Sequence, residues 1–291
     1  MAKRALCVGI NEFKWLPSTS WLNGCVNDAR DVAGALEKFG FTGGSTTVLT
    51  DAEATKKAVM TALDTMVGTA EPGDHLVFSF SSHGTQVPNE PGGDVEPDDL
   101  DEAFACHDIK QHGDQWDRDT VIVDDELHDL FARVPSGVLL EVLLDTCHSG
   151  TGLRDLEDIM RAQLLGRKPR FLPAPTRQGL GVVRGIRSLT AERGGDRNPT
   201  AELTKGLRRG ARPVLFAACK PDQTASDATF DGRPNGAFTH LFLKAMQDSP
   251  GATRSELLRS VTAGLKDGDF SQRSTLEGPA KAKQVAFGEL W

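Results

Sequence analysis

The sequence predicts an α/β fold in which a mostly parallel central β-sheet is flanked by helices on both faces. Two observations carry this prediction. Short apolar runs alternate along the chain with stretches of helical spacing, which is the pattern of a parallel sheet with crossover helices. One run, residues 137–150 (GVLLEVLLDTCHSG), is apolar along most of its length, as expected of a strand that is covered on both faces.

The first 150 residues hold four expected strands and three expected helices. The helical segments carry apolar side chains three and four positions apart. We expect Gly40 to end the first helix and Asp51 to cap the second. The expected strands lie at 4–10, 46–50, 75–84 and 137–150, and the expected helices at 27–41, 51–67 and 124–134.

The regular pattern stops after residue 150. Residues 151–212 are dense in Arg, Gly and Pro, so we expect a long loop there. Beyond it we expect a strand at 212–219, helices at 236–247 and 253–265, and a last strand at 284–290. The whole chain, 1–291, is therefore predicted to form a single domain in which the 151–212 loop joins two regions, 1–150 and 213–291.

Composition excludes several classes of protein. The 291 residues are 38% hydrophobic and 25% charged, which excludes collagen-like, coiled-coil and wholly disordered chains. No apolar run approaches the roughly 20 residues of a membrane helix, and the five cysteines are scattered without a CxxC pair. We therefore expect a cytoplasmic protein with reduced thiols and no membrane partner.

Charge is distributed unevenly along the chain. The net charge is −8, which argues against nucleic acid as a partner. Residues 151–212 nevertheless contain 12 Arg and 2 Lys against 6 Asp or Glu. An acidic body therefore carries a basic insert.

Two strands are followed by residues that suit nucleophilic catalysis. His83 follows the strand in FSFSSHG, and Cys147 follows the strand in LLDTCHSG. Active sites of open parallel sheets lie at the carboxyl ends of strands, so we expect the two side chains to face each other there. Cysteine can attack an acyl carbon as a thiolate, and histidine can protonate the leaving amine. The backbone N–H groups of Gly84 and Cys147 are expected to form an oxyanion hole.

With SSHG and DTCHSG in place, the sequence resembles the metacaspases of the prokaryotic, type I-like kind, within the caspase-like (clan CD) cysteine peptidases. The resemblance extends to CVGINEF, LNGCVNDARDVAGAL, IVDDEL, LFAACKPDQTASD and GAFTHLFLKAM. It implies a caspase-like fold, with residues 1–150 similar to the p20 region and 213–291 similar to the p10 region.

The resemblance also implies the reaction and its residues. His83 and Cys147 would form the catalytic dyad of an endopeptidase that cuts after Arg or Lys. Asp28 and Asp145 match the acidic positions of the pocket for the basic side chain, and Ser81 matches a position in its wall. The implied partners are protein or peptide substrates, and we expect a monomer. An acidic body suits a basic substrate.

Calcium is the one activator that the resemblance suggests, although the chemistry itself requires no cofactor. The ligands would be carboxylates, which calcium prefers, and the candidates are Asp98, Asp101, Asp124 and Asp125. The alternative is that residues 94–102 form only a solvated acidic loop. At the position seven residues after the nucleophile, where the family often has a carboxylate, this chain has Arg154.

Two further alternatives stay open. The basic insert is either a solvated linker or a regulatory segment, which the enzyme cuts or which folds over the acidic cleft and inhibits it. The chain as a whole could also be a catalytically silent, caspase-fold interaction protein. A nucleotide-binding domain is disfavoured, because no GxGxxG or GxxxxGK[ST] turn follows any strand.

Overall fold

A computed structural model describes residues 1–89, 100–147, 164–175, 203–204, 206–207, 212–220 and 223–291. Its centre is a six-stranded sheet to which both regions of the chain contribute strands. All neighbouring strands are parallel except the pair β11 and β14. In spatial order the strands are β14 (Thr275–Glu277), β11 (Val214–Ala217), β9 (Leu139–Asp145), β3 (His75–Ser81), β1 (Lys3–Gly9) and β2 (Thr46–Thr50).

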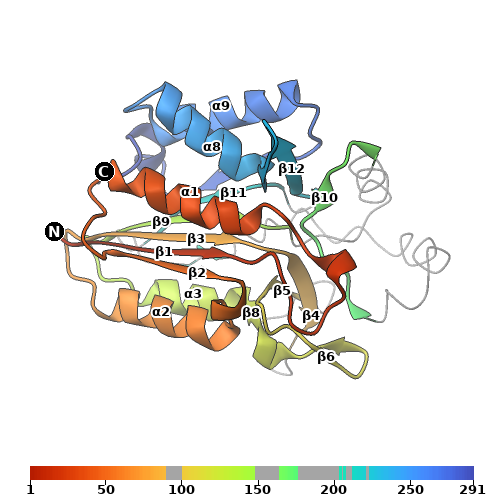
Figure 1. Cartoon of the computed structure of the whole chain (residues 1–291). Coiled ribbons are helices and arrows are strands. Elements are labelled where there is room, and N and C mark those ends of the chain that lie inside the picture. Colours follow the sequence, from red (N-terminus) through yellow and green to blue (C-terminus); the bar gives the residue numbers. More distant parts are fainter. Residues whose placement is uncertain (90–99, 148–163, 176–202, 205, 208–211, 221–222) are drawn as a thin grey trace.

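Helices cover both faces of this sheet, as the sequence predicts. The described helices form one group on each face (Figure 1). The first group is α2 (Lys56–Gly68) and α3 (Asp124–Ala132), and the second is α1 (Cys25–Glu37), α8 (Ala237–Asp248) and α9 (Arg254–Asp267). Each face has its own buried apolar cluster. β3 and β9 are buried along their whole length, which explains the nearly continuous apolar sequence of β9.

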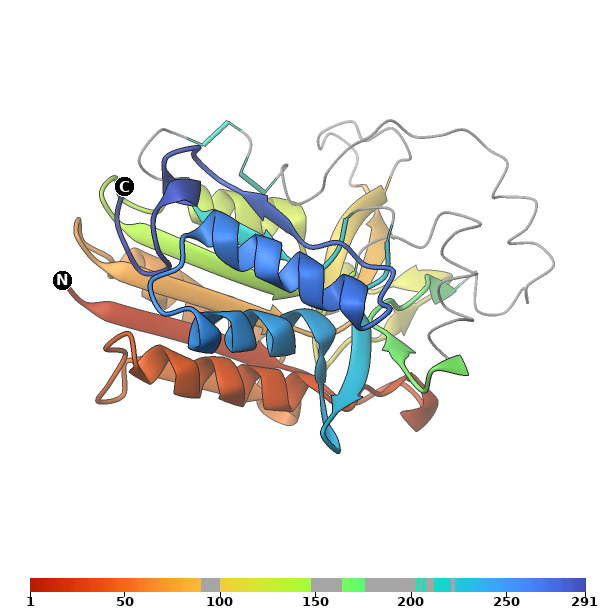
Figure 2. The same cartoon turned by 90° about the horizontal axis from the view of Figure 1, so that it is seen from above.

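Three small antiparallel sheets extend the fold, and the two larger ones lie beyond the carboxyl ends of the central strands (Figures 1 and 2). The sequence interpretation missed these three sheets. They are the sheet of β4 (Gly84–Pro88), β5 (Leu100–Ala105) and β8 (Val121–Val123), the sheet of β10 (Lys168–Pro169), β12 (Ser226–Phe230) and β13 (Arg233–Gly236), and the pair β6 (Gln111–His112) and β7 (Gln115–Trp116).

Three local predictions were wrong. Asp51 does not cap α2: Thr55 does, through its side chain, while Asp51 accepts hydrogen bonds from the N–H groups of Asn11 and Glu12. The C-cap of α1 is Lys38, and Gly40 lies two residues further on with a φ of +82°.

The last strand is β14 and not residues 284–290. Within the latter, Phe287 is buried through contacts with the Phe39, His75 and Phe242 rings. Its apolar character therefore reflects packing and not strand pairing. Among its described residues, the expected long loop at 151–212 contains the short strand β10. No helix in the described part of the chain is long and apolar enough to cross a membrane.

Candidate active site

The central sheet brings the predicted dyad to one edge. β3 and β9 are parallel neighbours, and Ser81 of β3 is paired with Asp145 of β9 in the last step of their register. His83 and Cys147 each follow two residues after this pair. Because neighbouring strands lie roughly 5 Å apart, the two side chains belong to the same site, and both are buried.

The hydrogen bonds of His83 define its tautomer. Nε2 lies 2.7 Å from the carbonyl oxygen of Ser20. A carbonyl only accepts, so Nε2 carries the proton and Nδ1 of the neutral ring is an acceptor. Nδ1 forms no hydrogen bond with any described residue. Burial lowers the pKa of His83 to about 4, against smaller raising effects of the Ser20 and Arg170 main chains. The ring is therefore neutral near pH 7.

Cys147 lies between backbone groups and a second thiol. Its Sγ donates a hydrogen bond of 2.7 Å to the carbonyl oxygen of Gln223. The thiol of Cys219 donates to the Thr146 carbonyl oxygen. A hydrogen bond with Cys147, together with burial, raises the pKa of Cys219 well above its usual value. Cys219 therefore stays a neutral thiol and is a poor nucleophile.

A guanidinium occupies the predicted acidic pocket, and it belongs to the chain itself. The side chain of Arg170 is completely buried. Its Nη2 lies 2.7 Å from Asp28 and 3.0 Å from Asp227, and its Nη1 lies 3.1 Å from Asp145. Three buried carboxylates therefore surround one cation, an arrangement that offsets the cost of removing the charge from water.

Asp28 lies in the first turn of α1, four residues after the N-cap residue Gly24. Asp28 is therefore a residue of the helix itself and not its N-cap. Besides Arg170, its carboxylate accepts hydrogen bonds from the Asn235 side chain and from the N–H of Gly236. Burial, partly offset by Arg170, raises the pKa of Asp28 to about 7. Its charge, and with it the charge of the pocket, therefore changes near neutral pH.

Asp145 is oriented from the other side of the pocket. Its Oδ2 accepts hydrogen bonds from the Thr239 N–H, at 3.0 Å, and hydroxyl, at 2.7 Å. Ser81 lies beside it in the register and is buried, and its Oγ forms no hydrogen bond with the described residues. A Cβ on Gly236 would lie 2.5 Å from Nη1 of Arg170. Only glycine at that position leaves room for the guanidinium.

Asp227 is the pocket residue that sequence reasoning missed. It lies on β12, and its carboxylate also accepts hydrogen bonds from the N–H groups of Asn23 and Gly24 just before α1. The available signal was a carboxylate in LFAACKPDQTASD, a motif already identified as part of the resemblance. Its closeness to Asp28 depends on contacts about 200 residues apart, which the motif alone does not reveal.

One of the two N–H groups expected to form the oxyanion hole is already hydrogen-bonded within the chain. The N–H of Gly84 donates to the carbonyl oxygen of Arg170 at 2.9 Å. The group that we expect to stabilise an oxyanion thus already binds the carbonyl of the residue whose side chain fills the pocket.

The calcium candidates do not gather into a site within the described residues. Asp101, on β5, forms an ion pair with Arg118. Asp124 and Asp125 lie in the first turn of α3, and Asp98 lies outside the described residues. No three metal-ligating side chains come together among those that the structure describes. The carboxylates described here thus do not form a calcium site by themselves, and calcium activation stays a prediction.

Comparison with known families decides what kind of domain carries this site. The family model for the metacaspase, peptidase C14 domain matches residues 3–156, which is more than half of the chain. The chain belongs to the metacaspase family. Its domain is therefore that of a cysteine peptidase, a hydrolase.

Curated metacaspases are similar along most of this chain. Metacaspase-1 of Mycosarcoma maydis is 32% identical over 295 residues, covering 94% of this chain and 69% of that protein. Metacaspase-1 of Cryptococcus neoformans (strain JEC21) is 31% identical over 296 residues, covering 94% of this chain. The present chain spans 62% of the length of the Cryptococcus protein.

Solved structures confirm the caspase-like α/β fold. Protein GSU0716 from Geobacter sulfurreducens aligns with a TM-score of 0.65 at 23% identity, covering 98% of this chain and 97% of that one. Caspase-1 from Spodoptera frugiperda aligns with a TM-score of 0.55 at 12% identity, covering 95% and 86%. At these identities the likeness shows the fold alone.

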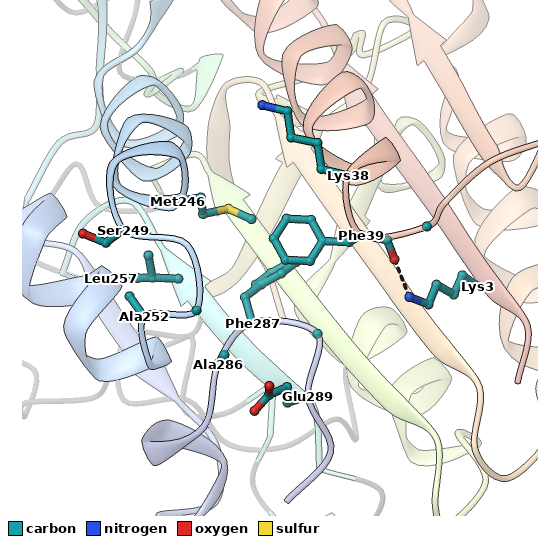
Figure 3. Close-up of a pocket in the computed structure, with 13 residues that line it drawn as sticks. Lys3, Lys38, Phe39, Met246, Ser249, Ala252, Leu257, Ala286, Phe287 and Glu289 are labelled. Atoms are coloured by element: carbon teal, nitrogen blue, oxygen red, sulfur yellow. Dashed lines mark hydrogen bonds between the residues drawn. The ribbon is translucent and has the colours of Figure 1, made fainter.

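A hollow between α1, α8 and the C-terminal segment is separate from the peptidase site of this metacaspase. Phe39, Met246 and Phe287 form its apolar wall (Figure 3). Lys3, which begins β1, also lines it, so the hollow lies at the amino ends of the strands. His83 and Cys147 lie at the opposite edge.

The pKa of Asp28 leads to a prediction about pH. Ionised Asp28 attracts a basic side chain more strongly than the protonated form, so binding strength is gained as pH rises through about 7 and lost as it falls. We expect the kcat/KM ratio of an Arg peptide to its citrulline analogue to rise several-fold as the pH is raised through and above about 7, because a pocket without Arg170 lacks the cation that lowers the pKa of Asp28. Ionisation of the nucleophile affects kcat/KM for both peptides equally, so it does not change their ratio. In Asp28→Asn it should be flat, and an equal rise in that variant would assign the effect to another group.

Proposed function

We propose that this metacaspase is an endopeptidase that cuts peptide bonds after Arg or Lys with a Cys147–His83 dyad. The observation that supports this is the cage of Asp28, Asp145 and Asp227 around a guanidinium beside the dyad. When the Arg170 guanidinium leaves the pocket, the three buried carboxylates favour binding of another cationic side chain. Binding of a neutral or acidic side chain is disfavoured, because it would leave the carboxylates unpaired. A Lys ammonium can pair with the same carboxylates as a point charge.

In the first step Nδ1 of His83 accepts the proton of the Cys147 thiol. The thiolate attacks the carbonyl carbon that follows the bound basic side chain, and His83 then gives its proton to the leaving amine. Two contacts hold the imidazole in place. The Ser20 carbonyl oxygen accepts its hydrogen bond, and the centroid of the Phe13 ring lies 5.2 Å from that of His83. Water hydrolyses the thioester with His83 as base, which restores the thiol.

The N–H groups of Gly84 and Cys147 stabilise the oxyanion of this proposal. Such fixed donors act at the atom on which charge develops, and one donor typically contributes about 10²-fold to 10³-fold in rate. Support comes from Gly84, whose N–H already binds a carbonyl oxygen in the site. No step of the reaction passes through calcium.

Peptides that differ only in their last residue test the proposal. Arg, Lys, citrulline and Asp would each precede the same fluorogenic leaving group, and citrulline keeps the shape of Arg without its charge. We expect kcat/KM for Arg and Lys to exceed that for citrulline and Asp at least about 100-fold. Each peptide is assayed with calcium and with a chelator, which tests calcium activation directly.

Equal rates for Arg and citrulline would contradict the acidic pocket. If neither the full chain nor Arg170→Gln, a variant whose pocket lacks the guanidinium, hydrolysed any peptide, the alternative of a silent interaction protein would be favoured. Self-processing within residues 151–212 also belongs to this proposal, since that segment holds 14 basic residues.

A further inference from the structure

A second thiol lies beside the nucleophile of the proposed reaction. Cys147 follows β9 and Cys219 follows β11, each by two residues, and the two strands are parallel neighbours. Beyond their last pair, the N–H of Ala218 still donates to the carbonyl oxygen of Leu144 at 2.9 Å. Continuing this register places Cys219 opposite Thr146, the residue directly before Cys147. The two cysteines therefore lie on adjacent strand ends, one residue out of step.

The contacts of the Cys219 side chain agree with this placement. Its Sγ lies 3.6 Å from the carbonyl oxygen of Thr146, and the carbon of that carbonyl is bonded to the nitrogen of Cys147. The two thiols also interact directly, through a hydrogen bond. Both belong to the buried apolar cluster on one face of the sheet, whereas Cys106 belongs to the cluster on the other face.

This placement suits a disulfide bond. Both side chains are reduced thiols in the structure. A step of one strand, roughly 5 Å, combined with a step of one residue, roughly 3.3 Å, separates two Cα atoms by roughly 6 Å. Disulfides span Cα separations of about 4.4–6.8 Å. A bond between the sulfur atoms of Cys147 and Cys219 therefore requires little movement of the backbone.

Hydrogen bonds hold the chain on both sides of Cys219. Before it, the carbonyl oxygen of Ala218 accepts hydrogen bonds from the side chains of Gln272, at 3.0 Å, and Ser274, at 3.2 Å. After it, the carbonyl oxygen of Gln223 accepts the hydrogen bond of the Cys147 thiol at 2.7 Å. Groups that are held next to each other in this way react much faster than the same groups free in solution.

We propose that Cys219 is the resolving thiol of Cys147: a hydroperoxide oxidises the nucleophile, and Cys219 converts the product into a Cys147–Cys219 disulfide that switches the peptidase off reversibly. This regulation rests on the proposed function, because it acts on the thiol that the proposed reaction uses. It gives Cys219 a role that peptide hydrolysis does not require.

Two steps account for all atoms and electrons, written here for hydrogen peroxide. In the first, the Cys147 thiolate attacks one peroxide oxygen, the O–O bond breaks, and Cys147 becomes a sulfenic acid. The hydroxide that leaves takes the thiol proton from His83 and becomes water. In the second, the Cys219 sulfur attacks the Cys147 sulfur, the S–O bond breaks, and the departing hydroxyl takes the Cys219 proton as a second water. One peroxide is reduced by two electrons, and two thiols are oxidised to one disulfide.

The two sulfur atoms differ in the way that these steps require. The hydrogen bond with Cys147 raises the pKa of Cys219 most, and burial and the charge of Cys147 raise it further. In the reduced enzyme Cys219 therefore stays a neutral thiol, which reacts poorly with an oxidant. Oxidation of Cys147 to the neutral sulfenic acid removes the thiolate charge beside Cys219. Cys219 thus becomes the better nucleophile only after Cys147 has been oxidised.

The disulfide also protects the nucleophile from permanent damage. A sulfenic acid that meets no second thiol is oxidised further to a sulfinic acid, which thiol reductants do not reverse. A disulfide is reduced by thiol exchange, which returns both sulfur atoms to thiols. Loss of the Cys219 thiol is therefore expected to turn a reversible inactivation into an irreversible one.

Peptide mapping after oxidation tests the bond. The full chain and Arg170→Gln would be treated with hydrogen peroxide, blocked by alkylation and digested without reductant. We expect a cross-linked pair of peptides that contains Cys147 and Cys219 and lacks two hydrogens relative to the reduced pair. Cys106 should remain a thiol that is alkylated once the chain unfolds. Cys147 found only as a sulfinic acid, or bonded to a different cysteine, would overturn the proposal.

Rates with a fluorogenic Arg peptide test the switch. Wild type under excess hydrogen peroxide should lose at least about 90% of its activity and regain most of it with dithiothreitol. Cys219→Ala and Cys219→Ser, which is close in size to the native residue, should be active when reduced. After oxidation, dithiothreitol should restore at least about fivefold less activity in these variants than in wild type. Cys106→Ala is the matched control and should recover as wild type does.

The outcomes separate this regulation from the proposed function. Recovery of oxidised Cys219→Ala and Cys219→Ser to the wild-type extent, in protein that cuts Arg peptides when reduced, would overturn the role of Cys219 and leave the proposed function standing. Absence of Arg-peptide cleavage in reduced wild type and in reduced Arg170→Gln would overturn the proposed function, and the regulation with it.

Discussion

Replacing Cys147 with Ala is expected to lower kcat/KM for Arg peptides by at least about 10³-fold, since the neighbouring thiol, Cys219, has a strongly raised pKa and stays protonated. Cys147 follows β9 at the edge where His83 follows β3. Initial rates with a fluorogenic Arg peptide measure the effect. Circular dichroism should show an unchanged fold, because the substitution removes a single sulfur atom.

Cys219→Ala is the matched control for this loss. Its thiol interacts with Cys147, yet its pKa is raised well above the usual value, so it remains protonated. We expect this variant to retain most of the activity. Loss in Cys219→Ala with retention in Cys147→Ala would reverse the assignment of the nucleophile.

Glu141→Ala is expected to lower the free energy of unfolding by about 3–5 kcal/mol, because it leaves a buried guanidinium unpaired. Glu141 lies within β9 and is completely buried. It pairs with Arg254 of α9 and with His75 at the start of β3, each at 2.7 Å. The cluster thus ties α9 to the central sheet, at a distance from the dyad.

Urea unfolding measures this difference. The matched control is Asp64→Ala, which breaks an ion pair with Arg133 in which both side chains are more than half exposed, and exposed pairs of this kind contribute about 0–1 kcal/mol. A cost for Glu141→Ala as small as that for Asp64→Ala would show that the cluster does not stabilise the fold. The pairing with Arg254 and His75 explains why a carboxylate lies among the apolar residues of β9.

The catalytic edge could be predicted from the sequence because it follows from strand order and local motifs. FSFSSHG and LLDTCHSG place His83 and Cys147 directly after buried strands, and such residues meet at the carboxyl edge of a parallel sheet. Asp28 and Asp145 came from the resemblance, and the structure brings both to one guanidinium.

The occupant of the pocket could not be predicted. Arg is among the residues least often fully buried, and the insert offered twelve arginines without a signal that distinguishes Arg170. Arg170 is placed in the pocket by the pairing of the preceding strand β10 with β12, and these two strands are about 60 residues apart in the sequence. Such pairings depend on tertiary contacts, which cannot be read from the spacing of apolar residues or from the composition of the sequence. The same reason explains why Asp227 was missed.

The most direct measurement is covalent trapping of the nucleophile by a peptidyl chloromethyl ketone ending in Arg, with a matched reagent ending in Asp. Both the self-cut chain and Arg170→Gln would be treated, and the adduct located by peptide mapping. We expect the Arg reagent to modify Cys147 much faster than the Asp reagent does and to leave Cys219 unmodified. Equal rates for the two reagents, or an adduct on another cysteine, would contradict it.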